Sequence, residues 1–290
     1  MGSPAPGGEH GRRRAVPTAT PVGGSRDAAL TLRGVSVHYG DAPALLDLDL
    51  DVEAHAITAI IGPSGSGKST LLAACNRMLE LTPGTRVRGS VHLYGHDVYA
   101  RGVDAVEVRR RIGLVADRPV PFDRSIRENV TFGPRLHGVR RRDHAPIVER
   151  SLRRVGLWSA VHDRLDSPAR TLSLGQQQAL CIARSLATEP DVLLLDEPCA
   201  TLDPIATLRI EELLRELRRT LTIVLVTHDL QQAARVSDRT ALLAGEHGGD
   251  TGRVQAEGRA GRLIEVGDTV SLFTRPAHPR TEAYVTGRAG

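Results

Sequence analysis

The chain has 290 residues, of which 40% are apolar and 25% charged, and this composition predicts a folded globular protein. The formal net charge of +4 and the low aromatic content of 3% argue against a nucleic-acid partner, because such partners are usually bound by clustered basic and aromatic side chains. The three cysteines lack the spacing of a metal site. No segment approaches the about 18 consecutive apolar residues of a membrane-spanning helix, and no secretory leader is evident. We therefore expect a cytosolic protein that reaches a membrane only through a partner.

The first elements run from strand through a Gly-rich turn into a helix. Residues 1–27 are rich in Gly, Pro, Ser and Arg without periodicity, which is typical of a disordered extension. A strand-like pattern begins at Leu30, and residues 45–52 alternate between apolar and acidic side chains. The continuous apolar run Ile57–Ile61 predicts a strand that is buried on both faces. Apolar residues at helical spacing follow over 67–79.

The second half alternates helical and strand-like segments. Residues about 122–172 carry helical stretches and many arginines, and we expect them to form an inserted helical subdomain. Strand character returns at Val192–Leu195 and Thr222–Val226, and between these strands a helix begins at Asp203 with proline in its first turn. Residues 245–261 predict a Gly-rich surface loop. Strands that alternate with helices predict an α/β fold with a mainly parallel sheet.

The turn after Ile57–Ile61 carries a phosphate-binding motif. It matches GxxxxGK[ST] without a gap and ends in a threonine: Gly62, Pro63, Ser64, Gly65, Ser66, Gly67, Lys68, Ser69 and Thr70. Glycines let the backbone curl so that successive N–H groups point at phosphates. We expect Lys68, the only lysine of the chain, to reach the β- and γ-phosphates of ATP, and the Ser69 hydroxyl to bind Mg²⁺. The alternative interpretation is a chance Gly-rich turn.

Two later strands end in candidate catalytic residues. The run Val192–Leu195 is followed by Asp196, which is expected to hold Mg²⁺, and by Glu197, which is expected to act as the general base for the attacking water. Taken alone, such an acidic pair is more often a solvated cap. His228 follows Thr222–Val226, and we expect a neutral imidazole that faces the γ-phosphate, the alternative being a structural histidine.

Two further features point to nucleotide binding and to a dimer. Tyr39 precedes a glycine at the end of a predicted strand and is expected to stack on adenine, although it could simply cap the strand. Ser173, Gly175 and Gln176 open a helix predicted over Gln177–Ala187 and form a second anion site. Because one ATP does not need two phosphate sites in one chain, this pattern predicts a head-to-tail dimer that closes over the γ-phosphate.

In this order, these residues resemble the nucleotide-binding subunits of ABC transporters, over roughly residues 28–290. The likeness is strongest to the ATPase subunits of Pst-type bacterial phosphate importers. It is carried by Pro119–Gly133, Gly175–Arg184, Glu197–Pro204, Val226–Arg235 and Thr281–Gly290. Of these stretches, we expect Thr281–Gly290 to lie far from the nucleotide.

The resemblance implies a P-loop NTPase fold of ABC type, with a mainly parallel sheet core, an antiparallel β part and an inserted helical subdomain. It also implies ATP and Mg²⁺ as cofactors and stacking of Tyr39 on the adenine. Ser173, Gly175 and Gln176 are implied to act across the interface of a homodimer or of paired ATPase subunits. Asp203 is implied to lie in the loop that links the two nucleotide sites. The implied partners are two membrane permease subunits and, indirectly, a periplasmic phosphate-binding protein, which places the chain at the cytoplasmic face of the membrane.

The chain departs from the family pattern at three positions. Asp117 stands where the family has a glutamine that binds Mg²⁺ through its carbonyl oxygen, Leu174 replaces a glycine and Ala179 replaces an arginine. We expect an ATP-hydrolysing subunit that energises phosphate import, slower than relatives with every consensus residue. The alternatives are a weakly active regulatory or accessory paralogue, an importer ATPase for another solute and, last, a soluble ABC ATPase of DNA repair or translation.

Overall fold

The computed structural model describes residues 28–245 and 260–288. The extension predicted for residues 1–27 and most of the loop predicted for 245–261 lie outside these ranges. The two end residues of the predicted loop belong to strands instead. Gly245 is the last residue of β9, Gly261 is the first residue of β10, and the two residues pair with each other.

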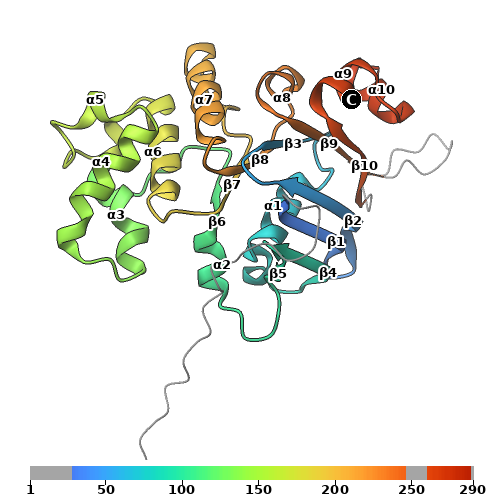
Figure 1. Cartoon of the computed structure of the whole chain (residues 1–290), viewed down its shortest axis with the longest axis horizontal. Coiled ribbons are helices and arrows are strands. Elements are labelled where there is room, and N and C mark those ends of the chain that lie inside the picture. Colours follow the sequence, from blue (N-terminus) through green and yellow to red (C-terminus); the bar gives the residue numbers. More distant parts are fainter. Residues whose placement is uncertain (1–27, 246–259, 289–290) are drawn as a thin grey trace, which may run out of the picture.

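In the described part of the chain, ten strands form one sheet in the order β5-β4-β1-β2-β10-β9-β3-β8-β7-β6 (Figure 1). The strands are β1 (Ala28–Tyr39), β2 (Ala42–Glu53), β3 (Ile57–Ile61), β4 (Thr85–Leu93), β5 (His96–Asp97), β6 (Ile112–Val115), β7 (Val192–Asp196), β8 (Thr222–Val226), β9 (Arg239–Gly245) and β10 (Gly261–Asp268).

One half of the sheet is parallel and buried. Strands β9, β3, β8, β7 and β6 pair in parallel, and every residue of β3 and of β8 is buried, which explains their continuous apolar sequences. The carboxyl ends of these strands meet at one edge of the sheet, where ligands of such sheets usually bind. The functional residues predicted after β3, β7 and β8 therefore share this edge.

The other half is mainly antiparallel, although β10 pairs in parallel with β2. Strands β1, β2, β4 and β5 pair in antiparallel fashion, and β9 pairs in the same way with β10. Residue patterning alone did not reveal β4, β5, β9 or β10. In β4 most side chains are exposed or half-buried and several are basic, so that it lacks a clear alternation of apolar residues.

The helices and 3-10 turns cover both faces of the sheet. They are α1 (Lys68–Cys75), η1 (Met78–Leu81), α2 (Ala105–Arg111), α3 (Ile126–Leu136), η2 (Arg141–Asp143), α4 (His144–Arg154), α5 (Trp158–Val161), η3 (Ala169–Thr171), α6 (Leu174–Leu186), α7 (Pro204–Leu217), α8 (Leu230–Val236), α9 (Thr269–Thr274) and α10 (Pro279–Val285). Helices α3–α6 gather at one end of the molecule, and α9 and α10 lie at the other end beside β10 (Figure 1).

Alternate residues of the parallel strands belong to different cores. Leu193 and Leu195 of β7 pack into the core shared with α3–α7, whereas Val192 and Leu194 pack into the core shared with α1 and the antiparallel strands. The sheet is therefore covered on both faces, as expected for an α/β fold. In the part of the chain that the structure describes, no helix is long and apolar enough to cross a membrane.

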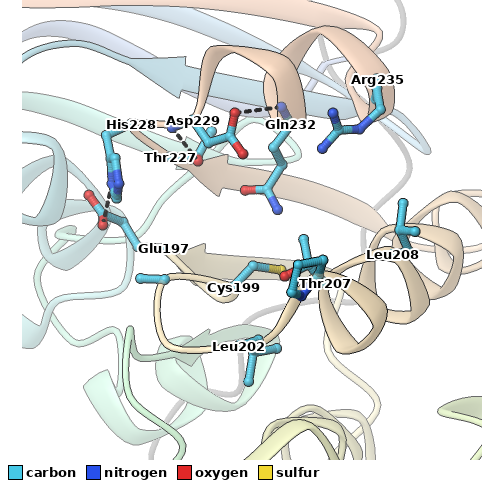
Figure 2. Close-up of a pocket in the computed structure, with 12 residues that line it drawn as sticks. Glu197, Cys199, Leu202, Thr207, Leu208, Thr227, His228, Asp229, Gln232 and Arg235 are labelled. Atoms are coloured by element: carbon cyan, nitrogen blue, oxygen red, sulfur yellow. Dashed lines mark hydrogen bonds and ion pairs between the residues drawn. The ribbon is translucent and has the colours of Figure 1, made fainter.

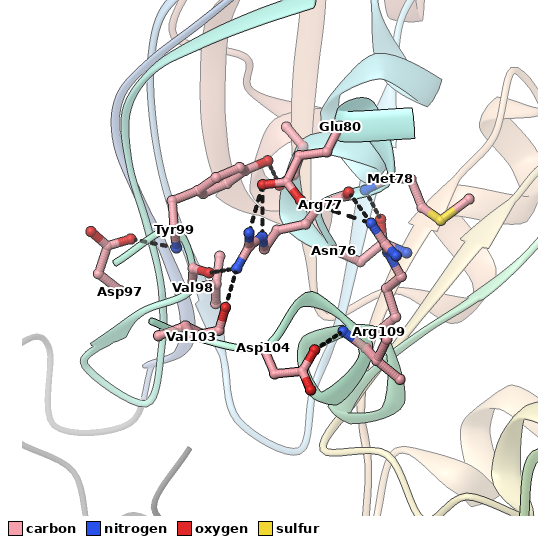
Figure 3. Close-up of polar contacts among 12 residues, drawn as sticks. Asn76, Arg77, Met78, Glu80, Asp97, Val98, Tyr99, Val103, Asp104 and Arg109 are labelled. Carbon is pink, nitrogen blue, oxygen red and sulfur yellow. Dashed lines mark hydrogen bonds and ion pairs between the residues drawn. The ribbon is translucent and has the colours of Figure 1, made fainter. Parts of the chain in front are cut away.

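The helix predicted for 67–79 is interrupted. Helix α1 ends at Cys75, and Arg77 has a positive φ of 61° before η1 begins. Contacts of Arg77 accompany this conformation (Figure 3): its Nη1 donates to the carbonyl oxygens of Val98 and Val103, at 3.0 and 2.9 Å, and its own carbonyl accepts from Nη2 of Arg109 at 2.9 Å. The break thus fixes the far end of α1 against the segment that follows β5.

Candidate functional site

The phosphate loop joins β3 to α1, as the sequence predicts. Gly62 has a φ of 151°, and a Cβ atom at this position would lie 1.9 Å from the carbonyl oxygen of Leu243 in β9. Gly67 has a φ of 94° in the left-handed region and is the N-cap of α1. Both positions therefore require glycine for conformation or for space.

Lys68 lies inside this loop. Its side chain is 6% exposed, and its Nζ donates to the carbonyl oxygens of Gly62 and Pro63 at 2.8 and 2.9 Å. Burial lowers the pKa of the ammonium, while the negative charges of Glu197 and Asp196 raise it. The ammonium thus lies near the acidic pair that follows β7, although the two motifs are 128 positions apart in sequence (196 minus 68).

Asp196 ends β7 and faces the start of α1. Burial raises the pKa of its carboxyl group, the hydroxyl of Ser69 lowers it, and the negative charges of Glu197 and Asp117 raise it further. Asp117 itself is exposed, in the segment after β6. A hydroxyl and two carboxylates, one of them partly buried, suit a hard cation such as Mg²⁺. Among residues 28–245 and 260–288 no cluster of three or more His, Cys, Asp and Glu side chains is arranged to hold a metal ion by itself.

Glu197 and His228 lie in direct contact. The Nδ1–H of His228 donates to Oε2 of Glu197 at 2.7 Å. Glu197 has a positive φ of 45°, and its backbone N–H donates to the carbonyl oxygen of Val226 in β8. Backbone strain of this kind is typical of functional positions. The sequence predicted both residues at the site, but it did not predict that they contact each other.

Tyr39 lies beside the phosphate loop. Tyr39 is the last residue of β1 and is 38% exposed. Its hydroxyl lies 3.2 Å from the hydroxyl of Thr70, and either group can be the donor of this hydrogen bond. This contact brings the predicted adenine-stacking ring next to the first turn of α1. The ring remains exposed enough to accept a planar ligand.

The residues of the predicted second anion site lie at the start of α6. This helix begins at Leu174 and not at Gln177 as predicted, because Ser173 and Gln176 form a capping box: Oγ of Ser173 accepts from the Gln176 N–H, and Oε1 of Gln176 accepts from the Ser173 N–H. Ser173 is exposed, and a Cβ atom on Gly175 would lie 2.8 Å from Cβ of Ala206 in α7. Helix α6 belongs to the group α3–α6, away from α1 (Figure 1).

The departures from the family pattern lie in different environments. Leu174 is exposed in the first turn of α6, so its side chain is not needed inside the chain. Ala179 is buried in the core shared by α3–α7 and contributes to packing within the chain. Asp203 is the N-cap of α7, where its Oδ1 accepts from the N–H of Ala206 at 2.9 Å.

A cavity of about 500 Å³ adjoins Glu197 and His228 (Figure 2). Its lining comes from the segment between β7 and α7, from α7 and from β8 to α8: Glu197, Cys199, Ala200, Leu202, Pro204, Thr207, Leu208, Thr227, His228, Asp229, Gln232 and Arg235. Sequence reasoning missed Cys199, in the segment between β7 and α7, and Gln232 and Arg235, both on α8. Burial raises the pKa of the Cys199 thiol to about 11, so this thiol is protonated near neutral pH.

The chain resembles known proteins along most of its length. Residues 45–200 match the ABC transporter family. The chain is 52% identical over 276 residues to "Phosphate import ATP-binding protein PstB 1" of Synechococcus sp. (strain JA-2-3B'a(2-13)), a match that covers 93% of this chain and 98% of that protein. It is also 52% identical over 263 residues to "Phosphate import ATP-binding protein PstB" of Mycolicibacterium smegmatis, with 90% and 98% covered.

Two solved structures share the fold. One is cbiO1 from Clostridium perfringens, part of the ABC transporter complex cbiONQ, with a TM-score of 0.71 and 28% identity over 86% of this chain and 92% of that chain. The other is a bacterial Atm1-family ABC exporter with ATP bound, with a TM-score of 0.70 and 25% identity over 96% of this chain and 44% of that chain. These similarities, together with the phosphate loop and the acidic pair, show that the chain belongs to the ABC transporter family and is an ATP-binding ATPase.

Proposed function

We propose that this chain is the ATP-hydrolysing subunit that energises import of inorganic phosphate across the cytoplasmic membrane. The observation that carries the proposal is an identity of 51 to 52% along at least 90% of the chain with three relatives that are named phosphate import ATP-binding proteins. A similarity that extends over nearly the full length of these relatives covers regions outside the nucleotide site, so it points to a shared role beyond ATP binding.

The phosphate loop, residues 62–70, would hold the triphosphate of ATP. Its backbone N–H groups and the positive end of α1 attract phosphate oxygens. Lys68 would exchange its loop carbonyl partners for the β- and γ-phosphates. Tyr39 would stack on the adenine. Residues 28–290 would form this nucleotide-binding domain, with residues about 122–172 as its helical subdomain.

Ser69, Asp196 and Asp117 would hold Mg²⁺, directly or through water. When bound, this ion neutralises charge that develops on the phosphates. The pKa of Asp196 is raised by burial and by two neighbouring carboxylates, and a bound cation would relieve both penalties. The residues present therefore fit the ion.

Glu197 would take the proton of the attacking water. Its hydrogen bond with Nδ1 of His228 fixes the direction of the carboxylate. The positive φ of Glu197 and its backbone bond to β8 hold the base at the edge of the sheet. The two side chains would thus act as one unit.

A second ATPase subunit would complete the site. Ser173, Gly175 and Gln176 lie at the exposed start of α6, a helix of 13 residues whose N-terminus attracts negative charge. Since α6 lies in the helical group and the phosphate loop at the sheet, these residues would meet the γ-phosphate held by another copy or by a paired subunit. The assembled ATPase would work with two membrane permease subunits at the cytoplasmic face, and indirectly with a periplasmic phosphate-binding protein.

The test is transport by a reconstituted complex. The chain is co-purified with its permease subunits, placed in vesicles with the cognate binding protein, and assayed for ATP-dependent uptake of labelled phosphate, with sulfate as the control solute. Uptake of phosphate that requires Lys68 and exceeds sulfate uptake is expected. Uptake of sulfate or another solute in place of phosphate would contradict the proposal and favour an importer of that solute.

A second candidate function is a weakly active regulatory paralogue, and it is favoured by the position of Asp117. This carboxylate adds negative charge next to Asp196, where the family has a neutral glutamine. ATP hydrolysis by the wild-type complex is compared with that of Asp117→Gln. Turnover near zero in wild type and restored by the glutamine favours the paralogue, whereas substantial wild-type turnover favours the transporter subunit.

A further inference from the structure

The sequence suggested that the stretch from Thr281 onward lies far from the nucleotide site. The structure shows that α10, which contains Tyr284, lies close to it. Tyr284 of α10 is half-buried and packs against the cluster formed by Ala59, Ile61, Ala233, Leu242 and Leu272. Ile61 is the last residue of β3 and directly precedes Gly62. The ring of Tyr284 therefore packs on the cluster that contains the residue before the phosphate loop.

Helix α10 is held at this place by polar contacts. The carboxylate of Glu265 in β10 accepts from the backbone N–H groups of Ala277 and His278, at 2.8 and 3.0 Å, and so fixes the entry into α10. Nη2 of Arg280 donates to the carbonyl oxygen of Gly245 at the end of β9. These bonds tie the short helix to the two strands beside it.

The same two strands support the back of the phosphate loop. The carbonyl oxygen of Leu243 in β9 lies 1.9 Å from a Cβ atom built on Gly62. The carbonyl oxygen of Ser66 lies 2.0 Å from a Cβ atom built on Gly261, the first residue of β10. Both contacts leave no room for a side chain, so the loop lies directly on the backbone that carries α10.

Gly62 connects Tyr284 to the loop lysine. Burial raises the pKa of the Tyr284 hydroxyl, the backbone of Gly62 lowers it by hydrogen bonding, and the negative charge of Glu197 raises it. On its other side, the carbonyl oxygen of Gly62 accepts from Nζ of Lys68 at 2.8 Å. The residue between β3 and the loop is thus contacted from α10 and from Lys68.

We propose that Tyr284 is a positioning residue for the phosphate loop, which it holds through the backbone of Gly62 so that Lys68 lies ready for the triphosphate. This inference rests on the proposed role of residues 62–70 in ATP binding. It gives the C-terminal helix a task in nucleotide affinity and none in proton transfer, because the hydroxyl acts on the loop backbone and not on the reacting atoms.

The test compares two variants that each remove one phenol hydroxyl and keep the ring. Tyr284→Phe removes the hydroxyl near Gly62. Tyr99→Phe is the matched control, because the Tyr99 hydroxyl donates to the carbonyl oxygen of Ala74 at 2.7 Å, in the last turn of α1 and away from the phosphate loop (Figure 3). The full chain is used for ATP titration and thermal melting, and its complex with the permease subunits for steady-state hydrolysis.

Tyr284→Phe is expected to weaken ATP binding and raise KM roughly five-fold, the effect of one neutral hydrogen bond, with kcat changed by less than about two-fold. Tyr99→Phe is expected to bind ATP like wild type, even if its melting temperature falls. A merely structural role of Tyr284 would lower the melting temperature without this split between KM and kcat. Wild-type affinity in Tyr284→Phe, or equal weakening in both variants, overturns the inference.

Lys68→Ala is measured in parallel. If it loses tight ATP binding while Tyr284→Phe binds normally, the positioning role is wrong and the site assignment stands. If Lys68→Ala binds ATP as well as wild type, the assignment of the loop is wrong and the inference falls with it.

Discussion

The Nδ1 atom of His228 lies 2.7 Å from Oε2 of Glu197, although the two residues follow different strands and are 31 positions apart. The contact forms because β7 and β8 are parallel neighbours, so their carboxyl ends coincide at one edge of the sheet. A carboxylate held by an imidazole has a fixed direction, which a base needs in order to meet one water molecule. The geometry therefore makes the pair a unit whose members can be tested separately.

Glu197→Gln removes the proton acceptor and keeps the shape of the side chain. We expect ATP hydrolysis to fall by at least about 100-fold, the usual range for loss of a general base, with ATP binding retained. An ATP-bound dimer that persists in size-exclusion chromatography is the second expected result. Turnover at the wild-type rate would show that another group takes the proton.

His228→Ala leaves Glu197 without the partner that orients it. We expect kcat to fall by about 10- to 100-fold with little change in the affinity for ATP, because the ring contacts the base and not the phosphate loop. Steady-state kinetics with and without bound permease measure the effect. The double variant His228→Ala, Glu197→Gln should hydrolyse ATP hardly more slowly than Glu197→Gln alone. Independent losses of rate that add in free energy would contradict the idea that the two side chains act as one unit.

Lys68→Ala removes the ammonium that lies within the loop. We expect ATP affinity to fall by about 100-fold, because a charge-assisted contact to phosphate is lost. Lys68→Arg is expected to fail to restore it, since the side chain is 6% exposed and its place does not fit the planar guanidinium. Fluorescence titration with a labelled ATP analogue measures both variants, and tight binding by Lys68→Arg would refute the steric part of this prediction.

The ion pair of Glu211 and Arg235, of which only Glu211 is buried, is expected to contribute to stability. Glu211 of α7 is fully buried, and Arg235 of α8 binds both its carboxylate oxygens at 2.7 and 2.9 Å. Arg235→Ala leaves an unpaired buried carboxylate and should destabilise the fold by about 3 kcal/mol in urea unfolding. The control is the pair of Arg239 and Glu53, in which the carboxylate is 42% exposed and stays hydrated without its partner, so that Arg239→Ala should cost less than about 1 kcal/mol.

Replacement of both Glu211 and Arg235 separates the effect of the buried charge from that of packing. Glu211→Met combined with Arg235→Leu should recover most of the stability that Arg235→Ala loses, because no unpaired charge remains. If the double variant were as unstable as Arg235→Ala, side-chain packing and not the buried charge would be the cause.

Sequence patterns that lie within a few residues of each other predicted their structure well. The run Ile57–Ile61 is the buried strand β3, and Asp203 is the N-cap of α7 as predicted. The start of α6 was placed three residues too late, because the capping box of Ser173 and Gln176 was read as an anion site only. The helix over 67–79 was extended across Arg77, whose left-handed conformation depends on contacts with residues far along the chain.

The sequence by itself determined the phosphate loop, the order of its strand and helix and the presence of an acidic pair and a histidine, because backbone curl and apolar periodicity are local properties. Only the tertiary structure decided that His228 contacts Glu197, that Gly261 lies against Ser66 and that Tyr284 packs on the cluster that contains Ile61. These contacts join elements that are distant in sequence, and they form only when the strands are paired and the helices packed, so no local pattern can encode them.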